Sequence, residues 1–206
     1  MATETKSHPV FARVYTWLSP REDDAGQDEN RRELLAGAQG RALELGAGNG
    51  LNLRHYPPTV ERVVAVEPEP YLRAKAQEAA AGAPVVIRVV DGVADALPAG
   101  DGEFDAGVAS LVLCSVPDQA VALAELRRTI KAGGELRFYE HVIATHPRRA
   151  RIFRLVDRSG VWRHIAAGCH VARDTGASIE AAGFEVERMR RLSFNGLPHI
   201  LGVARA

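Results

Sequence analysis

The sequence has no long apolar run, no excess of charge of one sign and very little cysteine. No stretch of its 206 residues approaches the ~20 apolar residues that span a bilayer, and the first residues lack the apolar core of a secretory signal. Lys plus Arg equals Asp plus Glu, at 26 each, so no global field favours a nucleic acid as partner. We expect a cytoplasmic protein with no transmembrane segment and no nucleic-acid partner.

The sequence has too few cysteines for a disulfide framework, because Cys114 and Cys169 are its only two. In a reducing compartment we expect both to be thiols. The length suits one sizeable α/β domain, and an apolar fraction of 46% supplies enough core for it. We therefore expect a single domain over 1–206, with an N-terminal helical cap at 8–38 and a core at 40–206.

Strand-like and helix-like segments alternate after residue 40. Strands are expected at 41–46, 62–67, 85–90, 104–113, 135–142, 184–192 and 199–206. Helices are expected at 9–18, 28–38, 70–81, 118–131, 147–164 and 175–182. Only a loop at 193–198 separates the last two strands, so they should be antiparallel neighbours. The pattern predicts a doubly wound, Rossmann-like α/β fold with a seven-stranded, mostly parallel sheet and an antiparallel last strand.

A glycine-rich turn follows the first expected strand, where residues 44–50 read Glu-Leu-Gly-Ala-Gly-Asn-Gly. Glycines there let backbone N–H groups approach a ligand, and an expected helix after the turn would add partial positive charge. In an open parallel sheet, ligands bind at this carboxyl edge of the strands. The G-x-G-x-x-G fingerprint of dinucleotide-binding domains would need glycine at 51, where Leu51 stands.

Three further segments follow in an order that carries a family resemblance. Glu67 ends the second strand, where a carboxylate can accept hydrogen bonds from both hydroxyls of a ribose. With Asp95 before Leu-Pro, and Phe-Asp-Ala-Gly-Val-Ala-Ser-Leu at 104–111, the spacing resembles class I S-adenosylmethionine (SAM) methyltransferases. The resemblance implies SAM as cofactor and S-adenosylhomocysteine as product. It also implies a cofactor site formed by Glu44, Gly46, Ala47, Gly48, Asn49, Gly50, Glu67, Pro68, Val93, Ala94, Asp95 and Leu111.

The second half of the chain resembles the methyltransferase-like alkyl-thiol methyltransferases. The resemblance is carried by 111–116, 138–142, 162–175 and 197–202, of which 162–175 is the most specific. It implies S-methylation of a small-molecule thiol, although Glu67 stands where that family more often has Asp. N-, O- or C-methylation of a natural product, a quinone precursor or a phospholipid head group stays open. A second alternative that stays open is a protein that binds SAM or a dinucleotide without catalysing a reaction.

His141 is the candidate catalytic residue, because it follows the fifth strand and can face the crevice. A neutral imidazole can take a proton from a thiol near pH 7–8. The alternative is a histidine that only bonds to a neighbouring group at the end of the strand.

Several other side chains are candidates for the acceptor side. The set is Tyr15, Cys114, His164, Cys169, His170, Arg173 and His199. The cluster at 164–170 holds zinc-ligand types without a fourth ligand at convincing spacing, so we expect no metal. Asp174 is expected to cap the helix that begins near 175.

Two surface segments carry open alternatives. Tyr15, with Phe11 and Trp17, belongs either to a lid over the site or to a packed cap. The arginine-rich helix at 147–164 is either a solvated face with an apolar side that packs, or a contact with an anionic substrate, an acidic membrane surface or a second copy. The oligomeric state is left open.

Overall fold

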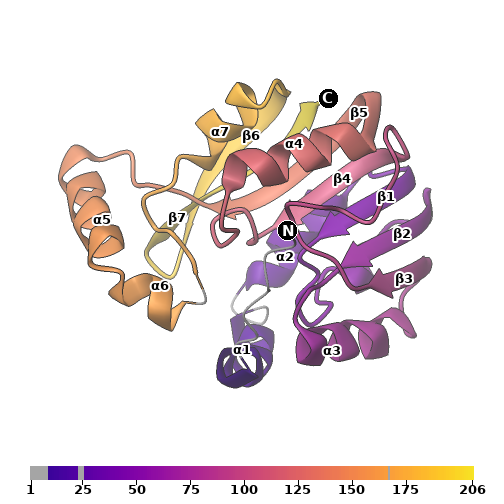
Figure 1. The fold of residues 1–206 in the computed structure, drawn as a ribbon, viewed down its shortest axis with the longest axis horizontal. Coiled ribbons are helices and arrows are strands. Elements are labelled where there is room, and N and C mark those ends of the chain that lie inside the picture. The colour runs from indigo at the N-terminus through magenta and orange to yellow at the C-terminus, as the bar shows by residue number, and fades with distance from the viewer. Residues whose placement is uncertain (1–8, 23–25, 167) are drawn as a thin grey trace.

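A seven-stranded sheet forms the centre of the protein (Figure 1). The computed structural model describes residues 9–22, 26–166 and 168–206, with only the backbone at 9–11, 20, 22, 164 and 165. The strands are β1 (Gly40–Leu45), β2 (Val60–Val66), β3 (Val86–Val90), β4 (Phe104–Ser110), β5 (Ile130–His141), β6 (Glu185–Phe194) and β7 (Leu197–Arg205). Their order is β3-β2-β1-β4-β5-β7-β6. β7 runs antiparallel to β5 and β6, whereas the other pairs are parallel, which confirms the expected fold.

Helices cover both faces of this sheet. They are α1 (Pro9–Glu22), α2 (Asp28–Leu35), α3 (Pro70–Ala80), α4 (Gln119–Thr129), α5 (Pro147–Ser159), α6 (Val161–Ile165) and α7 (Thr175–Ala181). One apolar core joins α4 and α7 to the sheet, and a second joins α2 and α3 to the opposite face. Within the described ranges, none of these helices has the length and apolar character to cross a membrane.

Side-chain caps explain where several helices begin. Asp118 accepts hydrogen bonds from the N–H groups of Ala120 and Val121 at 2.9 and 3.2 Å. Asp174 accepts one from Ala177 at 3.4 Å, so the cap expected from the sequence is confirmed. Such caps satisfy first-turn donors that have no partner inside the helix.

The expected helix after the glycine-rich turn is wrong. Only the short 3₁₀ turn η2 (Leu53–His55) follows. Gly50 has φ +86°, and a Cβ there would lie 2.7 Å from the Cβ of Ala79. The chain is pressed against α3 at this point, and that packing replaces a regular helix with turns.

Two other boundaries also differ from expectation. The single helix expected at 147–164 is split into α5 and α6, because Gly160 takes a left-handed conformation with φ +72°. The loop expected at 193–198 contracts to a two-residue turn at Asn195 and Gly196, with φ +48° and +75°. Asn-Gly is the favoured pair for a tight hairpin whose twist matches its strands.

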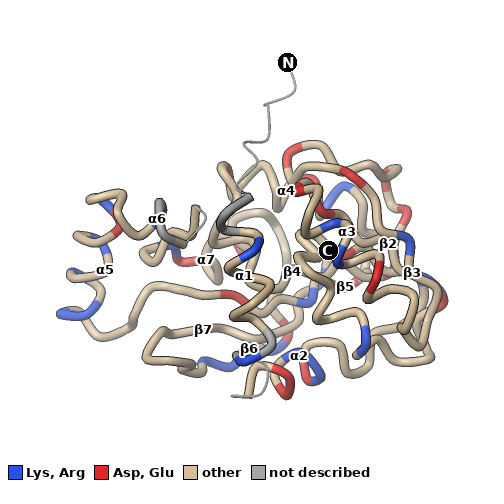
Figure 2. The backbone as a smooth tube through the Cα atoms, turned by 90° about the horizontal axis from the view of Figure 1, so that it is seen from below, with Lys and Arg blue, Asp and Glu red and all other residues tan. Residues whose placement is uncertain are grey.

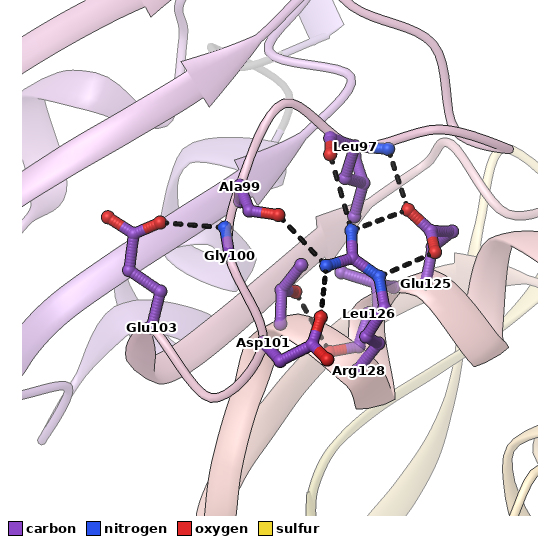
Figure 3. A network of polar contacts seen from close by, with 9 residues as sticks. Leu97, Ala99, Gly100, Asp101, Glu103, Glu125, Leu126 and Arg128 are labelled. Atoms are coloured by element: carbon purple, nitrogen blue, oxygen red, sulfur yellow. Dashed lines mark hydrogen bonds and ion pairs between the residues drawn. The ribbon is translucent and has the colours of Figure 1, made fainter.

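The strand order reverses between β1 and β4, and this reversal locates the crevice. In open α/β sheets ligands bind beyond the carboxyl ends of the strands at such a point. Arg128 of α4 holds the loop between β3 and β4 in place (Figure 3). The Arg128 guanidinium donates to the carbonyl of Ala99 and the carboxylate of Asp101, at 2.9 and 2.7 Å, and pairs with Glu125 at 2.7 Å.

Candidate cofactor and acceptor site

The glycine-rich turn has one open side, at Gly48. A Cβ on Gly46 would meet the Val112 side chain, so this glycine serves close packing. A Cβ on Gly48 would meet only the ring of Tyr15, with its nearest atom at 3.5 Å. Gly48 also has φ +57°, a conformation that favours glycine. Of the predicted glycines, Gly48 is therefore the one at which a ligand can approach the backbone.

Glu67 faces the same turn from the end of β2. Its carboxylate is buried and accepts hydrogen bonds from the N–H groups of Gly48 and Glu69, at 2.8 and 3.0 Å. Burial raises the pKa of this carboxyl, and the two N–H groups oppose that shift. The Glu67 side chain is thus fixed beside the glycine-rich turn before any ligand binds.

Glu44 supports the turn from below. It is fully buried and accepts hydrogen bonds from Asn52 Nδ2 and Tyr56 Oη, both at 2.8 Å. Arg31 of α2 donates to Asn52 Oδ1 at 2.9 Å and lowers the pKa of Glu44, although burial raises that pKa more. This network ties the N-terminal helices to the floor of the candidate site.

Helix α1 lies over the glycine-rich turn. Tyr15 is half-buried above Gly48, and Asn49 Nδ2 donates to Ser19 Oγ at 2.9 Å. Trp17 points outward with 62% of its surface exposed, and the side chain of Phe11 lies outside the described part. Of the aromatic residues expected near the entrance, Tyr15 is the one that meets the cofactor turn.

The remaining predicted cofactor residues lie on the loops after β1, β2 and β3. Ala47 is buried, Pro68, Val93 and Ala94 are half-buried, and Asp95 is exposed. Arg73, which sequence reasoning missed, donates to the carbonyls of Glu67 and Pro68 at 2.9 Å and pairs with Asp91 at 2.8 Å. It holds two of these loops together.

Leu111 ends β4 in a strained conformation. Its φ of +56° is rare for a residue with a side chain, and its N–H donates to Tyr139 O at 2.7 Å. Such strain persists where the surroundings fix the backbone, often at functional sites.

Glu140, in β5, fixes the loop that follows Leu111. Its buried carboxylate accepts the N–H groups of Val112, Leu113 and Cys114 at 3.0, 2.9 and 3.2 Å. Burial raises the pKa of Glu140 to about 7, while these N–H groups pull it down. Sequence reasoning missed this residue, although a glutamate between Phe-Tyr and His-Val in a buried strand was a signal.

His141 is buried at the end of β5, on the opposite face of the strand from Glu140. Its ring stacks on Phe153 of α5 at 6.4 Å and meets His199 edge-on at 5.4 Å. Neither ring nitrogen is hydrogen-bonded to a nitrogen or oxygen atom of the described residues. The imidazole is also close enough to the Cys169 thiol to lower the pKa of that thiol.

The two cysteines come together beside this histidine. Cys114 is buried, Cys169 is half-buried, and both are free thiols. The adjacent Cys114 thiol and His141 lower the pKa of Cys169, while the Cys169 thiol and burial raise the pKa of Cys114. His170 turns away and pairs with Asp157 of α5 at 3.2 Å. The side chain of His164 lies outside the described part.

Arg173 and His199 support the site through backbone groups. Arg173 Nη1 donates to Leu113 O at 2.7 Å, and Nη2 donates to Pro117 O at 3.3 Å. These bonds brace the loop after β4 and engage two guanidinium nitrogens of this acceptor-side candidate. His199 Nδ1 donates to Leu197 O at 2.9 Å, and burial lowers its pKa to about 4, so the ring is neutral at pH 7.

Helix α5 stands at the margin of the fold and carries many basic side chains (Figures 1 and 2). The exposed set is Arg148, Arg149, Arg151, Arg154 and Arg158. The expected apolar side does not pack as a whole, because Ile152 and Leu155 are 57% and 70% exposed. Only Ala150 of this helix is buried, and α5 contacts the body through Phe153 with His141, Asp157 with His170 and Arg149 with the carbonyl of Gly196.

Known proteins resemble this chain in sequence and in fold. A methyltransferase domain family matches residues 43–138. The human thiol S-methyltransferase TMT1B is 34% identical over 94% of this chain and 85% of that protein. The human thiol S-methyltransferase TMT1A is 31% identical over 84% of this chain and 77% of that protein.

Solved structures share the fold at lower identity. An S-adenosylmethionine dependent methyltransferase from Mesorhizobium loti has a TM-score of 0.65 and 20% identity, covering 90% of this chain and all of that one. The YcgJ protein from Bacillus subtilis has a TM-score of 0.70 and 17% identity, covering 86% of this chain and 98% of that one.

Proposed function

Because the chain belongs to the SAM-dependent methyltransferase family of these relatives, with SAM as its cofactor, we propose that it methylates the sulfur of a small-molecule thiol. The observation that carries the choice of acceptor is the 34% identity with a thiol S-methyltransferase along 94% of the chain. That span includes the acceptor side of the site as well as the cofactor side.

Two features at the glycine-rich turn support SAM as the ligand. A Cβ at Gly48 would meet only the ring of Tyr15, and Glu67 presents a fixed carboxylate to hydroxyl donors. When bound, SAM supplies a methyl group on a positively charged sulfur. Tyr15 covers Gly48 and keeps water from that end of the site.

His141 is the residue that we assign to the acceptor proton. Its ring is buried, and both nitrogens are free of nitrogen or oxygen partners among the described residues. Phe153 and His199 hold the ring between them. A neutral imidazole in this position accepts the proton of the incoming thiol, and the resulting thiolate is a strong nucleophile that needs only modest assistance.

A turnover assay with matched acceptors tests the proposal. SAM is supplied with an alkyl thiol, an aromatic thiol, an amine and a phenol, and release of S-adenosylhomocysteine is measured. We expect turnover with the thiols alone. Turnover with the amine or phenol, and none with either thiol, would refute S-methylation while leaving the cofactor assignment intact.

The role of His141 is tested with His141→Gln in the same assay. For an alkyl thiol, which is mostly protonated at neutral pH, the variant should lose about a hundredfold in kcat, the low end for a general base, because a thiol needs little assistance. For an aromatic thiol that is already ionised, the loss should be small. Equal losses with the two thiols would show that His141 does not take the proton. An unchanged Kd for SAM serves as the folding control.

A further inference from the structure

We propose that Cys169 and Cys114 form a thiol–disulfide exchange site at the carboxyl edge of the sheet, which takes low-molecular-weight disulfides as substrates. Cys169 is the attacking thiol, and Cys114 is the resolving thiol. This site goes beyond methyl transfer, because direct displacement at a sulfonium methyl needs no cysteine of the protein.

The backbone places the two cysteines on neighbouring segments. His170 N–H donates to Cys114 O at 2.8 Å, so the segment that carries Cys169 runs directly beside the loop after β4. A Cβ on Gly168 would lie 3.1 Å from Ser115 O, and Gly168 therefore allows this close approach. Paired backbones lie about 5 Å apart, and disulfides join Cα atoms at about 4.4–6.8 Å.

The two thiols are also close enough to affect each other. Both are free, and the first cause of the pKa shift of each thiol is the other thiol. Cys169 is half-buried and Cys114 is buried, so an incoming disulfide reaches Cys169 first. Their interaction lowers the pKa of Cys169 and raises the pKa of Cys114, which favours the thiolate at Cys169. The thiolate is the attacking species in exchange.

The exchange is balanced in two steps. The Cys169 thiolate attacks one sulfur of R–S–S–R, breaking that bond, forming a mixed disulfide and releasing one thiolate, which takes a proton from solvent. Cys114 then loses its proton and attacks the Cys169 sulfur, which expels the second thiolate and forms the Cys114–Cys169 bond. The cysteines are oxidised by two electrons, and one disulfide is reduced to two thiols.

Mass spectrometry of the full chain tests this sequence of events. Reduced protein is treated with bis(2-hydroxyethyl) disulfide, and intact masses and peptides are analysed without reductant. Wild type should lose two hydrogens and yield a linked Cys114–Cys169 peptide. Cys114→Ser should stop at the mixed disulfide on Cys169, whereas Cys169→Ser should react at least about tenfold more slowly.

A second measurement needs no variant. A substoichiometric pulse of iodoacetamide on reduced wild type should label Cys169 ahead of Cys114. Labelling of Cys114 first, or a wild type that keeps the mixed disulfide without closing the internal bond, would overturn the proposal. These readouts are independent of methyl transfer, so a failed thiol acceptor assay and a failed exchange site are distinguishable.

Discussion

The buried carboxyl of Glu140 predicts a specific dependence of stability on pH. This side chain receives three backbone N–H groups of the loop after β4, yet burial raises its pKa to about 7, from an ordinary value of 4.5. Between these two values the native state holds a proton that the unfolded chain has released. The free energy of unfolding therefore falls as pH rises through this window.

The size of the effect follows from the same two values. Each pKa unit of difference corresponds to about 1.4 kcal/mol, so the contribution approaches about 3 kcal/mol below pH 4.5 and vanishes above pH 7. Between pH 5 and pH 8 the expected change is about 2–3 kcal/mol.

Urea unfolding of wild type and Glu140→Gln at several pH values isolates this contribution. Glutamine does not titrate. Its NH2 group would face the N–H of Cys114, and this pair of donors lowers the free energy of unfolding by about 1–3 kcal/mol at every pH. Titrating groups that do not interact with Glu140, such as the buried Glu44, are common to both proteins and cancel. The stability advantage of wild type should shrink by about 2–3 kcal/mol from pH 5 to pH 8. A constant difference, or one that grows with pH, would mean that the N–H groups keep Glu140 ionised throughout.

Two further predictions concern the cofactor. Glu67→Gln should raise the Kd of SAM by about tenfold to a hundredfold, because a carboxylate that accepts hydrogen bonds contributes about 1.5–3 kcal/mol. Calorimetric titration measures this Kd. The matched control is Glu61→Gln, at the exposed opposite end of β2, which should leave the Kd of SAM unchanged. An equal Kd for both variants would remove Glu67 from the cofactor site. Tyr15→Ala should weaken SAM binding about tenfold and speed its release in stopped-flow experiments, because the ring covers the turn at Gly48. Trp17→Ala removes an exposed aromatic from the same helix and should do neither, so similar effects of the two substitutions would argue that α1 acts only through its own stability.

The sequence was enough to predict seven mostly parallel strands and the antiparallel last strand. Apolar runs identify the strands, and helices between them require parallel crossovers. The predictions that were wrong concern local structure. The turn after β1 lacks its helix because Gly50 is pressed against α3, a contact between segments far apart in the chain. Gly160 breaks the arginine-rich helix by its left-handed backbone, although glycine inside a helical pattern is often tolerated.

The candidate site was predictable in its types of residue and less so in their partners. The sequence pointed to Gly48, Glu67 and His141 without showing which of their neighbours hold them. Glu140 and Arg173 act on backbone groups of the loop after β4, and such bonds leave no spacing pattern in the sequence. Their roles depend on which loop folds against which strand, and that is settled only by the tertiary structure.

The network under the glycine-rich turn limits how this protein can be recombined. Arg31 reaches from α2 to Asn52 and lowers the pKa of the buried Glu44, while Leu34 and Leu35 of the same helix are fully buried. A chimaera that exchanged the N-terminal helices with those of a homologue would leave a carboxylate without its cation and a cavity beneath the sheet. Laboratory evolution of acceptor choice should therefore treat α2 and the turn as one inherited block, and place its crossovers after η2.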